Sequence, residues 1–290
     1  MIPNNNLSVL PWYTSIDQQN ARKWWVYNRV YPLFVRAGYF LPFQILIDHN
    51  AAALSLSHFY IYTADGTLVG DYATNIENGG LVKLQYETFG YDVLLFPGTT
   101  SVFASFANGQ YYAVMEANSE TFYSEIFTVV NDVQPYLKIE WYDNDDLVMD
   151  AGRIVYNYDG NQFKNVLYLM ADVAKPDYVF EEEGENRDGY FYPTKMISAK
   201  RYNFRFLASE YLLDVMRFIR MADYIKITYH SEIFSVDSFL LTPNWESNGD
   251  VAAVEAEFST ATVAKKIGAG YLRAMRGDFN DDFNVDFNNV

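Results

Sequence analysis

The sequence contains no cysteine. This absence excludes disulfide bonds, thiolate zinc sites, iron–sulfur clusters and cysteine nucleophiles, so stability must come from burial. Basic residues are also scarce, because 21 lysines and arginines stand against 37 aspartates and glutamates, which gives a net charge of −16. No segment carries the clustered basic residues that binding to phosphates requires. We therefore expect no direct nucleic-acid partner.

Long apolar runs are missing too. The most apolar stretch near the N-terminus, residues 37–47, contains Pro42 and is too short to cross a bilayer. The first six residues lack the positive and apolar regions of a secretory signal. We therefore expect a protein made in the cytosol, with no membrane partner.

Aromatic residues, in contrast, are abundant. The chain is 18% aromatic and 50% hydrophobic, which is enough side-chain volume for a packed interior and excludes disorder over the whole chain. At about 100–200 residues per domain, 290 residues predict two domains.

Residues 1–37 form a predicted aromatic arm. Residues 15–27 are compatible with a short helix and residues 24–27 with a strand, and the pattern does not decide between them. The aromatic side chains predict that the arm is buried against something. Its tryptophans and basic residues are Trp12, Trp24, Trp25, Arg22, Lys23, Arg29 and Arg36.

Residues 38–130 contain short apolar runs separated by glycine-containing turn signals. This spacing predicts about seven antiparallel strands in a β-sandwich of immunoglobulin or fibronectin type, without the disulfide. Asn108-Gly109 is the strongest hairpin signal. The predicted strands are residues 43–47, 59–63, 81–86, 91–96, 103–106, 111–116 and 126–130.

A boundary is predicted at residues 131–135, and residues 136–266 read as a second, β-dominated α+β domain. Residues 209–223 predict one helix, with Ser209 as the N-cap and an apolar face, packed on an antiparallel sheet. An acidic run at residues 181–189 is expected to be a solvated loop. The predicted strands are residues 136–142, 153–158, 165–170, 224–229, 233–241 and 251–259.

Residues 267–290 read as a flexible tail. Phe279, Phe283 and Phe287 recur every four residues among aspartates and asparagines, so they would share one helical face. The segment is too polar to stay helical alone. Two readings stay open: a solvated tail, or a docking peptide that folds when a partner buries the phenylalanines.

Catalytic signatures are not found. His49, His58 and His230 lie far apart without metal-ligand spacing, and there is no nucleophile elbow or phosphate-binding loop. Residues 143–146 resemble the start of a calcium loop but lack its glycine and glutamate, so a turn is favoured over a weak Ca²⁺ site. We predict a non-enzymatic protein without cofactor or metal. A glycoside hydrolase stays open, since it needs only two suitably spaced carboxylates.

Five segments carry a resemblance to known proteins: residues 109–115, 122–127, 198–204, 221–224 and 243–245. They resemble structural proteins of tailed bacteriophages, in particular the β-rich tail, neck and baseplate components of crAss-like phages of gut hosts. The resemblance extends over about half of the chain. It implies a virion role, many copies around a symmetry axis, no catalysis and an immunoglobulin-like domain used for subunit contact.

The expected function is therefore a structural virion component, assembled in the host cytoplasm from copies of the chain in a symmetric ring together with other virion proteins. The alternative is a glycan-binding or adhesin-like module, because exposed tryptophan and tyrosine rings can stack on a host glycan as well as fill protein interfaces. The predicted interaction residues are Trp12, Trp24, Trp25, Arg22, Lys23, Arg29, Phe279, Phe283 and Phe287.

Overall fold

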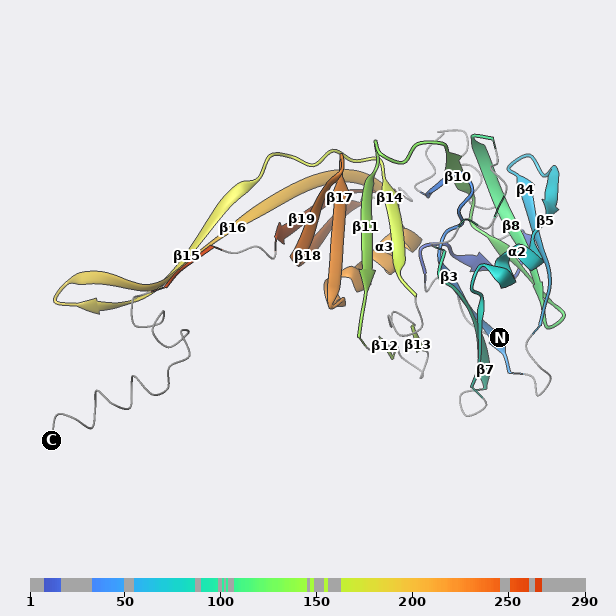
Figure 1. The fold of residues 1–290 in the computed structure, drawn as a ribbon, viewed down its shortest axis with the longest axis horizontal. Coiled ribbons are helices and arrows are strands. Elements are labelled where there is room, and N and C mark those ends of the chain that lie inside the picture. Colours follow the sequence, from blue (N-terminus) through green and yellow to red (C-terminus); the bar gives the residue numbers. More distant parts are fainter. Residues whose placement is uncertain are drawn as a thin grey trace.

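The computed structural model in Figure 1 describes most of the chain between Ser8 and Ile267 and is mainly β. The described residues are 8–16, 33–49, 55–86, 90–98, 101, 103, 107–144, 147–148, 154–155, 163–245, 251–260 and 264–267.

Two sheets make up the N-terminal half of the described chain. The first has seven strands: β1 (Trp12–Tyr13), β9 (Glu120–Ser124), β8 (Gly109–Ala117), β10 (Phe127–Val130) and β2 (Phe34–Arg36) in this order, with β4 (Leu56–Thr63) beside β8 and β5 (Leu68–Asp71) beside β4. The second has three: β3 (Phe43–Asp48), β7 (Tyr91–Phe96) and β6 (Val82–Tyr86). A short helix, α2 (Ala73–Asn78), precedes β6.

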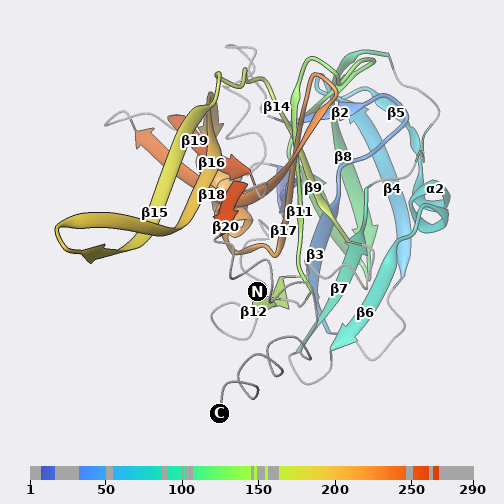
Figure 2. The same cartoon turned by 60° about the vertical axis from the view of Figure 1, so that its left-hand side comes forward.

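Aromatic side chains join these two sheets. Figure 2 shows β3, β7 and β6 of the second sheet next to one another. The Phe43 ring lies 5.1 Å from the Trp12 ring and 6.1 Å from the Phe59 ring, so β3 meets β1 and β4 across the interior. Phe40 packs edge-on against both Phe43 and Phe59. Edge-to-face and offset contacts of this kind add to the hydrophobic gain of burial.

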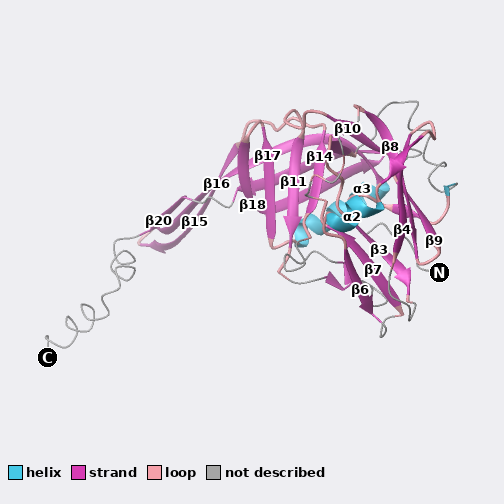
Figure 3. Cartoon of the chain, turned by 45° about the vertical axis from the view of Figure 1, so that its right-hand side comes forward, coloured by secondary structure: helices cyan, strands magenta, loops and turns pink. Residues whose placement is uncertain are grey.

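The C-terminal half is built on an eight-stranded sheet within the described residues. Figure 3 shows β18, β17, β11 and β14 side by side in it. The order is β14 (Asn165–Leu169), β11 (Leu137–Tyr142), β17 (Tyr224–Tyr229), β18 (Glu232–Trp245), β19 (Val251–Thr260), β16 (Tyr190–Ser209) and β15 (Asp177–Arg187), with β20 (Ala264–Ile267) paired to β16. A separate pair joins β12 (Leu147–Val148) to β13 (Ile154–Val155).

The predicted helix at residues 209–223 is present as α3 (Glu210–Met216), followed by a 3₁₀ turn, η5 (Arg217–Met221). Tyr211, Leu212, Val215 and Met216 of α3 are buried, as its apolar pattern predicts. Ser209 has the extended backbone of an N-cap, but its side chain makes no capping hydrogen bond. The sequence analysis did not find α2, whose six residues are too few for a periodic pattern.

One continuous core connects the two halves. A single cluster of buried side chains includes Phe40 and Phe96 from the first half and Trp141 and Phe204 from the second. The predicted boundary at residues 131–135 separates β10 from β11, which belong to different sheets, but the core extends across it. The predicted arm is likewise part of the body where it is described, since β1 pairs with β9 and β2 pairs with β10.

Two local predictions are wrong. Asn108-Gly109 does not turn a hairpin, because Gly109 is the first residue of β8 and pairs with Val129 of β10. The acidic run is not a loop. Residues 181–187 belong to β15, which pairs with β16 along its whole length, and only Asp188 and Gly189 form the turn. Their φ angles of 51° and 82° match the type I′ hairpin that Asp-Gly favours.

Candidate interaction surface and histidine–aspartate pairs

β15 and the first half of β16 form a hairpin, residues 177–200, that extends away from the other sheets (Figure 1). We call it the projecting hairpin. The second half of β16 stays in the body, where residues 201–209 pair with β19. The hairpin and the body therefore share one unbroken strand, and β20 pairs with residues 195–198 of that strand.

The strand register shows which side chains share a face of this sheet. Tyr202, Phe204 and Phe206 alternate along β16 and are buried in the core. Lys200 and Ser198 continue the same alternation outward, opposite Tyr178 and Phe180 of β15. Directly paired residues lie on one face of a sheet. Tyr178 and Phe180 therefore extend the core face of the sheet onto the projecting hairpin.

The Lys200 Nζ atom lies 6.0 Å from the centre of the Tyr178 ring, but the aromatic rings of this extension stay exposed. Tyr178 is 62% exposed and Phe180 is 66% exposed, whereas Phe204, on the same face in the body, is 2% exposed. Near the tip of the hairpin, Phe191 pairs with Asn186, whose side chain lies on the same face of β15 as Tyr178. Phe191 is also exposed. We call Tyr178, Phe180 and Phe191 the aromatic face. Isolated exposed apolar residues are ordinary, but a row that continues a core face indicates an interaction site.

The projecting hairpin is also acidic overall, because residues 177–200 contain six carboxylates against Arg187, Lys195 and Lys200. Residues 177–187 contain five carboxylates and one arginine, and the glutamates in this run are exposed. Charged residues along an edge strand such as β15 discourage indiscriminate pairing with the strands of other proteins. Pro193, which cannot donate a ladder hydrogen bond, lies at an irregularity of register between Glu183 and Gly184. The alternation along β15 places Glu182 on the same face as the aromatic side chains, whereas Glu181 and Glu183 lie on the opposite face.

The opposite face of the same sheet is built differently. Arg201 pairs with Glu257 at 3.1 Å and Arg205 pairs with Glu255 at 3.0 Å, both between β16 and β19. Ser238 and Ser259 share a hydrogen bond of 2.7 Å between β18 and β19. Cross-strand polar pairs of this kind suit a sheet face that stays in water.

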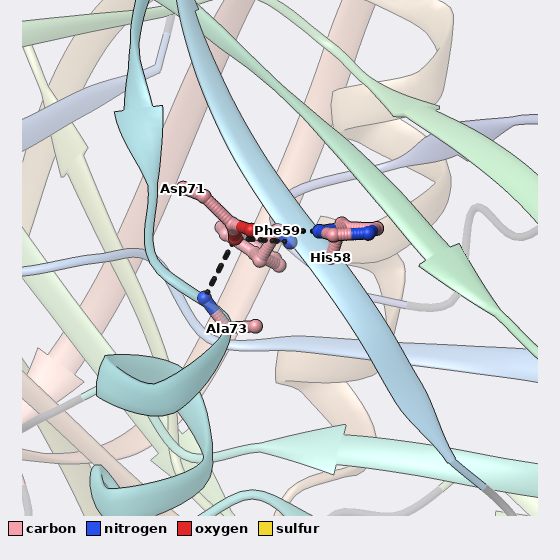
Figure 4. Close-up of polar contacts among 4 residues, drawn as sticks. All are labelled: His58, Phe59, Asp71 and Ala73. Carbon is pink, nitrogen blue, oxygen red and sulfur yellow. Dashed lines mark hydrogen bonds and ion pairs between the residues drawn. The ribbon is translucent and has the colours of Figure 1, made fainter.

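A second candidate is the His58–Asp71 pair (Figure 4). The Nδ1 atom of His58 on β4 lies 2.7 Å from Oδ2 of Asp71, and Oδ1 of Asp71 accepts hydrogen bonds from the backbone N–H groups of Phe59 and Ala73. The hydrogen bond to Asp71 raises the pKa of His58. Burial opposes the ionisation of Asp71, but the hydrogen bonds from His58, Phe59 and Ala73 outweigh it and lower its pKa. The pair ties β4 to β5 and to the first residue of α2.

The other histidines have separate surroundings. His49 Nδ1 lies 2.8 Å from Oδ1 of the fully buried Asp92, at the paired ends of β3 and β7. His230 is in the turn between β17 and β18 with a positive φ angle.

The carboxylate of Asp143, from the predicted calcium-loop-like segment, holds two strands together. Its Oδ1 accepts the backbone N–H of Asp223, which joins the end of β11 to the start of β17. Within the described ranges, no group of three or more His, Asp or Glu residues is placed to hold a metal ion.

The predicted interaction residues are located only in part. Trp12 is 1% exposed and packs on Phe43 and Phe59, so it is a core residue and offers no surface to a partner. Its prediction as an interaction residue is therefore wrong. The other eight, Trp24, Trp25, Arg22, Lys23, Arg29, Phe279, Phe283 and Phe287, lie outside the described residues. The sequence analysis missed the aromatic face because it read the acidic run as a loop.

No protein-family model matches the chain, and no curated protein matches its sequence. In the parts of the chain that the structure describes, no helix is both long enough and apolar enough to cross a membrane.

Proposed function

We propose that this chain is a non-enzymatic structural subunit that assembles with copies of itself through the projecting hairpin. The observation that carries the proposal is the continuation of the core face of the sheet into the exposed aromatic face of Tyr178, Phe180 and Phe191. From the resemblance to tail, neck and baseplate proteins, we further propose that the subunit is part of the virion of a tailed bacteriophage. It would assemble there in the host cytoplasm with other virion proteins.

The aromatic face is too small to hold two copies of the chain together without additional interactions. Burying the exposed parts of three aromatic side chains removes on the order of 300 Å² from water, which corresponds to roughly 8 kcal/mol of gross hydrophobic gain. Association costs about 4–15 kcal/mol in lost freedom. The aromatic face alone therefore gives weak binding, and the partner must supply further contacts.

We also propose the finer architecture that the sequence predicts: an immunoglobulin-like sandwich in the first half and one helix packed on the sheet of the second half. The ring contacts between β3, β1 and β4 support two facing layers in the first half. The four buried residues of α3 support a helix packed by its apolar side. In the first half, the parallel pairing of β10 with β2 and the insertion of α2 depart from the immunoglobulin pattern.

Light scattering of the full chain tests the assembly proposal. We expect a species larger than the 33.5 kDa monomer at micromolar concentration, and its loss in the double variant Tyr178→Thr/Phe180→Thr, which keeps β-forming side chains. The matched control is Leu207→Thr, because Leu207 is an exposed apolar residue on the opposite face of β16. A wild-type chain that stays monomeric at all concentrations would overturn the proposal.

A second candidate function is glycan binding. Trp245, at the end of β18, is partly exposed, whereas Trp12 and Trp141 are buried. An exposed indole ring is the kind of surface on which a sugar can stack. This candidate predicts that a host polysaccharide binds the monomer and that Trp245→Ala abolishes this binding without changing the oligomeric state.

A further inference from the structure

The projecting hairpin divides its charges between its two faces. The alternation along β15 places Asp177, Glu181 and Glu183 on the face opposite the aromatic face. Two charged side chains share the aromatic face itself: Glu182 on β15, and Lys200 on β16, which lies directly opposite a residue of that face. Both are exposed. The aromatic face therefore carries one charge of each sign, although the hairpin as a whole is acidic.

These two charges lie on either side of Phe180. Phe180 pairs with Ser198 across the two strands. The next pair on this face toward the body joins Tyr178 to Lys200, and the next pair toward the tip contains Glu182. Residues two positions apart on a strand are separated by about 7 Å. The positive and the negative charge are therefore equally far from the Phe180–Ser198 pair, in opposite directions along the strands.

Neither charge is neutralised within the part of the chain that the structure describes. No ion pair joins Glu182 or Lys200 to another described residue, and the ammonium group of Lys200 contacts the ring of Tyr178 instead. A partner that covers the aromatic face removes both charges from water, which is costly unless each meets an opposite charge. The partner must therefore present an acidic group to Lys200, an apolar surface to Phe180 and a basic group to Glu182.

A second copy of the hairpin presents these groups in the required order. A two-fold axis that runs across the strands, between two facing hairpins and beside Phe180, reverses the strand direction. It brings Lys200 of each copy toward Glu182 of the other and places both Phe180 rings at the axis. These two residues lie on neighbouring strands, which are about 5 Å apart, a distance that a lysine side chain spans. The aromatic face is thus complementary to itself, as a two-fold contact requires.

The same arrangement keeps the remaining acids apart. Asp177, Glu181 and Glu183 of each copy point away from the contact. Because sheets packed face to face lie about 10 Å apart, the outward carboxylates of the two copies are on the order of 20 Å apart, beyond the screening length of about 8 Å in physiological salt. A second copy also doubles the aromatic area removed from water. Next to Phe180 the contact surface is three strands wide, because β20 pairs with residues 195–198.

We propose that two copies of the chain join by their aromatic faces about a two-fold axis beside Phe180, with Lys200 of each copy paired to Glu182 of the other. This inference rests on the proposed function and names the surface that completes it. The two contacting surfaces are the same part of the chain, so the contact closes on itself. It produces a dimer, whereas a head-to-tail contact would produce a ring or a filament.

Charge reversals test the two-fold contact. Glu182→Lys brings two lysines together at both ends of the contact, and Lys200→Glu brings two glutamates together there. We expect each variant to raise the dissociation constant of the dimer at least about tenfold, measured by analytical ultracentrifugation. The double variant Glu182→Lys/Lys200→Glu restores both pairs within one kind of chain and should dimerise like wild type. An equimolar mixture of the two single variants should also dimerise, because each pair in the heterodimer again joins opposite charges.

Glu181→Lys is the matched control. It changes the charge of the hairpin by the same amount as Glu182→Lys, but on the face that points away from the contact, so it should leave the dissociation constant unchanged. If general repulsion between acidic hairpins governed assembly, both variants would strengthen the dimer. An equal effect of Glu181→Lys and Glu182→Lys would therefore overturn the two-fold contact. Near-ultraviolet circular dichroism checks that each variant is folded.

The outcomes also separate this inference from the proposed function. For wild type we expect the solution mass to level off at twice the 33.5 kDa monomer. If Tyr178→Thr/Phe180→Thr dissociates the assembly while Glu182→Lys and Lys200→Glu do not, the two-fold contact is wrong and the proposed function stands. A wild-type mass that rises past two copies, or a folded double reversal that stays monomeric, leads to the same conclusion. A wild-type chain that never assembles overturns both proposals.

Discussion

The imidazole of His58 and the carboxylate of Asp71 form an exposed pair in which Nδ1 and Oδ2 are 2.7 Å apart, at the junction of β4, β5 and α2. Asp71 also accepts two backbone N–H groups through its other oxygen. The residues are 13 positions apart, so the loop between them is closed by side chains as well as by strand pairing. Two predictions follow from this geometry.

The first concerns pH. The pKa of His58 is raised above 6.5, so its contribution to stability is complete below pH 6.5 and is lost as the pH rises through the folded-state pKa. The pKa of Asp71 is lowered below 3.8, so its contribution is present above pH 3.8 and is lost as the pH falls through the folded-state pKa. The pair therefore stabilises the fold most between these values. Urea unfolding should show a stability difference between wild type and His58→Gln at pH 5 that shrinks at pH 9. An equal difference at both values would contradict this assignment.

The second prediction separates the charge of Asp71 from its backbone hydrogen bonds. Asp71→Asn keeps an oxygen that can accept the N–H groups of Phe59 and Ala73 but removes the charge that His58 binds. Asp71→Ala removes both. Because Asp71 satisfies the backbone N–H of Ala73, the first residue of α2, we expect Asp71→Ala to lower the free energy of unfolding by about 1 kcal/mol more than Asp71→Asn at pH 7. Equal losses in the two variants would show that the backbone bonds contribute nothing.

A third prediction concerns a close approach of two backbone segments. A Cβ atom at Gly98 would lie 2.3 Å from the backbone nitrogen of Pro42, and Gly98 has a φ angle of +68°. Gly98→Ala must therefore displace backbone, and we expect a loss of about 3 kcal/mol or more in unfolding free energy. Gly66 has a φ angle of +93° but open space around it. Gly66→Ala should cost only about 1 kcal/mol. Thermal unfolding of both variants checks the ranking, which similar melting temperatures would refute.

The fourth prediction concerns the turn between β17 and β18. His230 and Ser231 have φ angles of 46° and 70° in a two-residue loop, although neither is a glycine or asparagine. Ser231→Gly should relieve the steric cost of the second position and raise stability by roughly 0.5–1 kcal/mol. Ser235→Gly, in the middle of β18, is the control and should lower stability. A Ser231→Gly variant less stable than wild type in urea would contradict the turn geometry.

Much of the strand content could be predicted from local patterns. The predicted strands at residues 91–96 and 224–229 coincide with β7 and β17, because apolar runs bounded by turn residues define a strand without reference to its partner. The helix at Glu210–Met216 was found for a similar reason, since its apolar side chains recur at helical spacing. The secondary structure of these elements can therefore be predicted from their own residues alone.

The remaining features depend on partners far along the chain. Residues 181–187 read as a loop by composition, yet they pair with residues 190–197 because the Asp188-Gly189 turn brings the two strands together. Trp12 is buried because Phe43 and Phe59 surround it, which its own segment does not indicate. The aromatic face could not be predicted either. It requires the register between β15 and β16, and register is a property of two strands.

The decisive experiment is to compare the solution mass of the full-length wild-type chain with that of Tyr178→Thr/Phe180→Thr by light scattering. We expect an assembly larger than the 33.5 kDa monomer for wild type and a folded monomer for the double variant. Wild type and double variant of the same mass, whether both monomers or both assemblies, would contradict the claim that the aromatic face of the projecting hairpin joins one copy of the chain to the next.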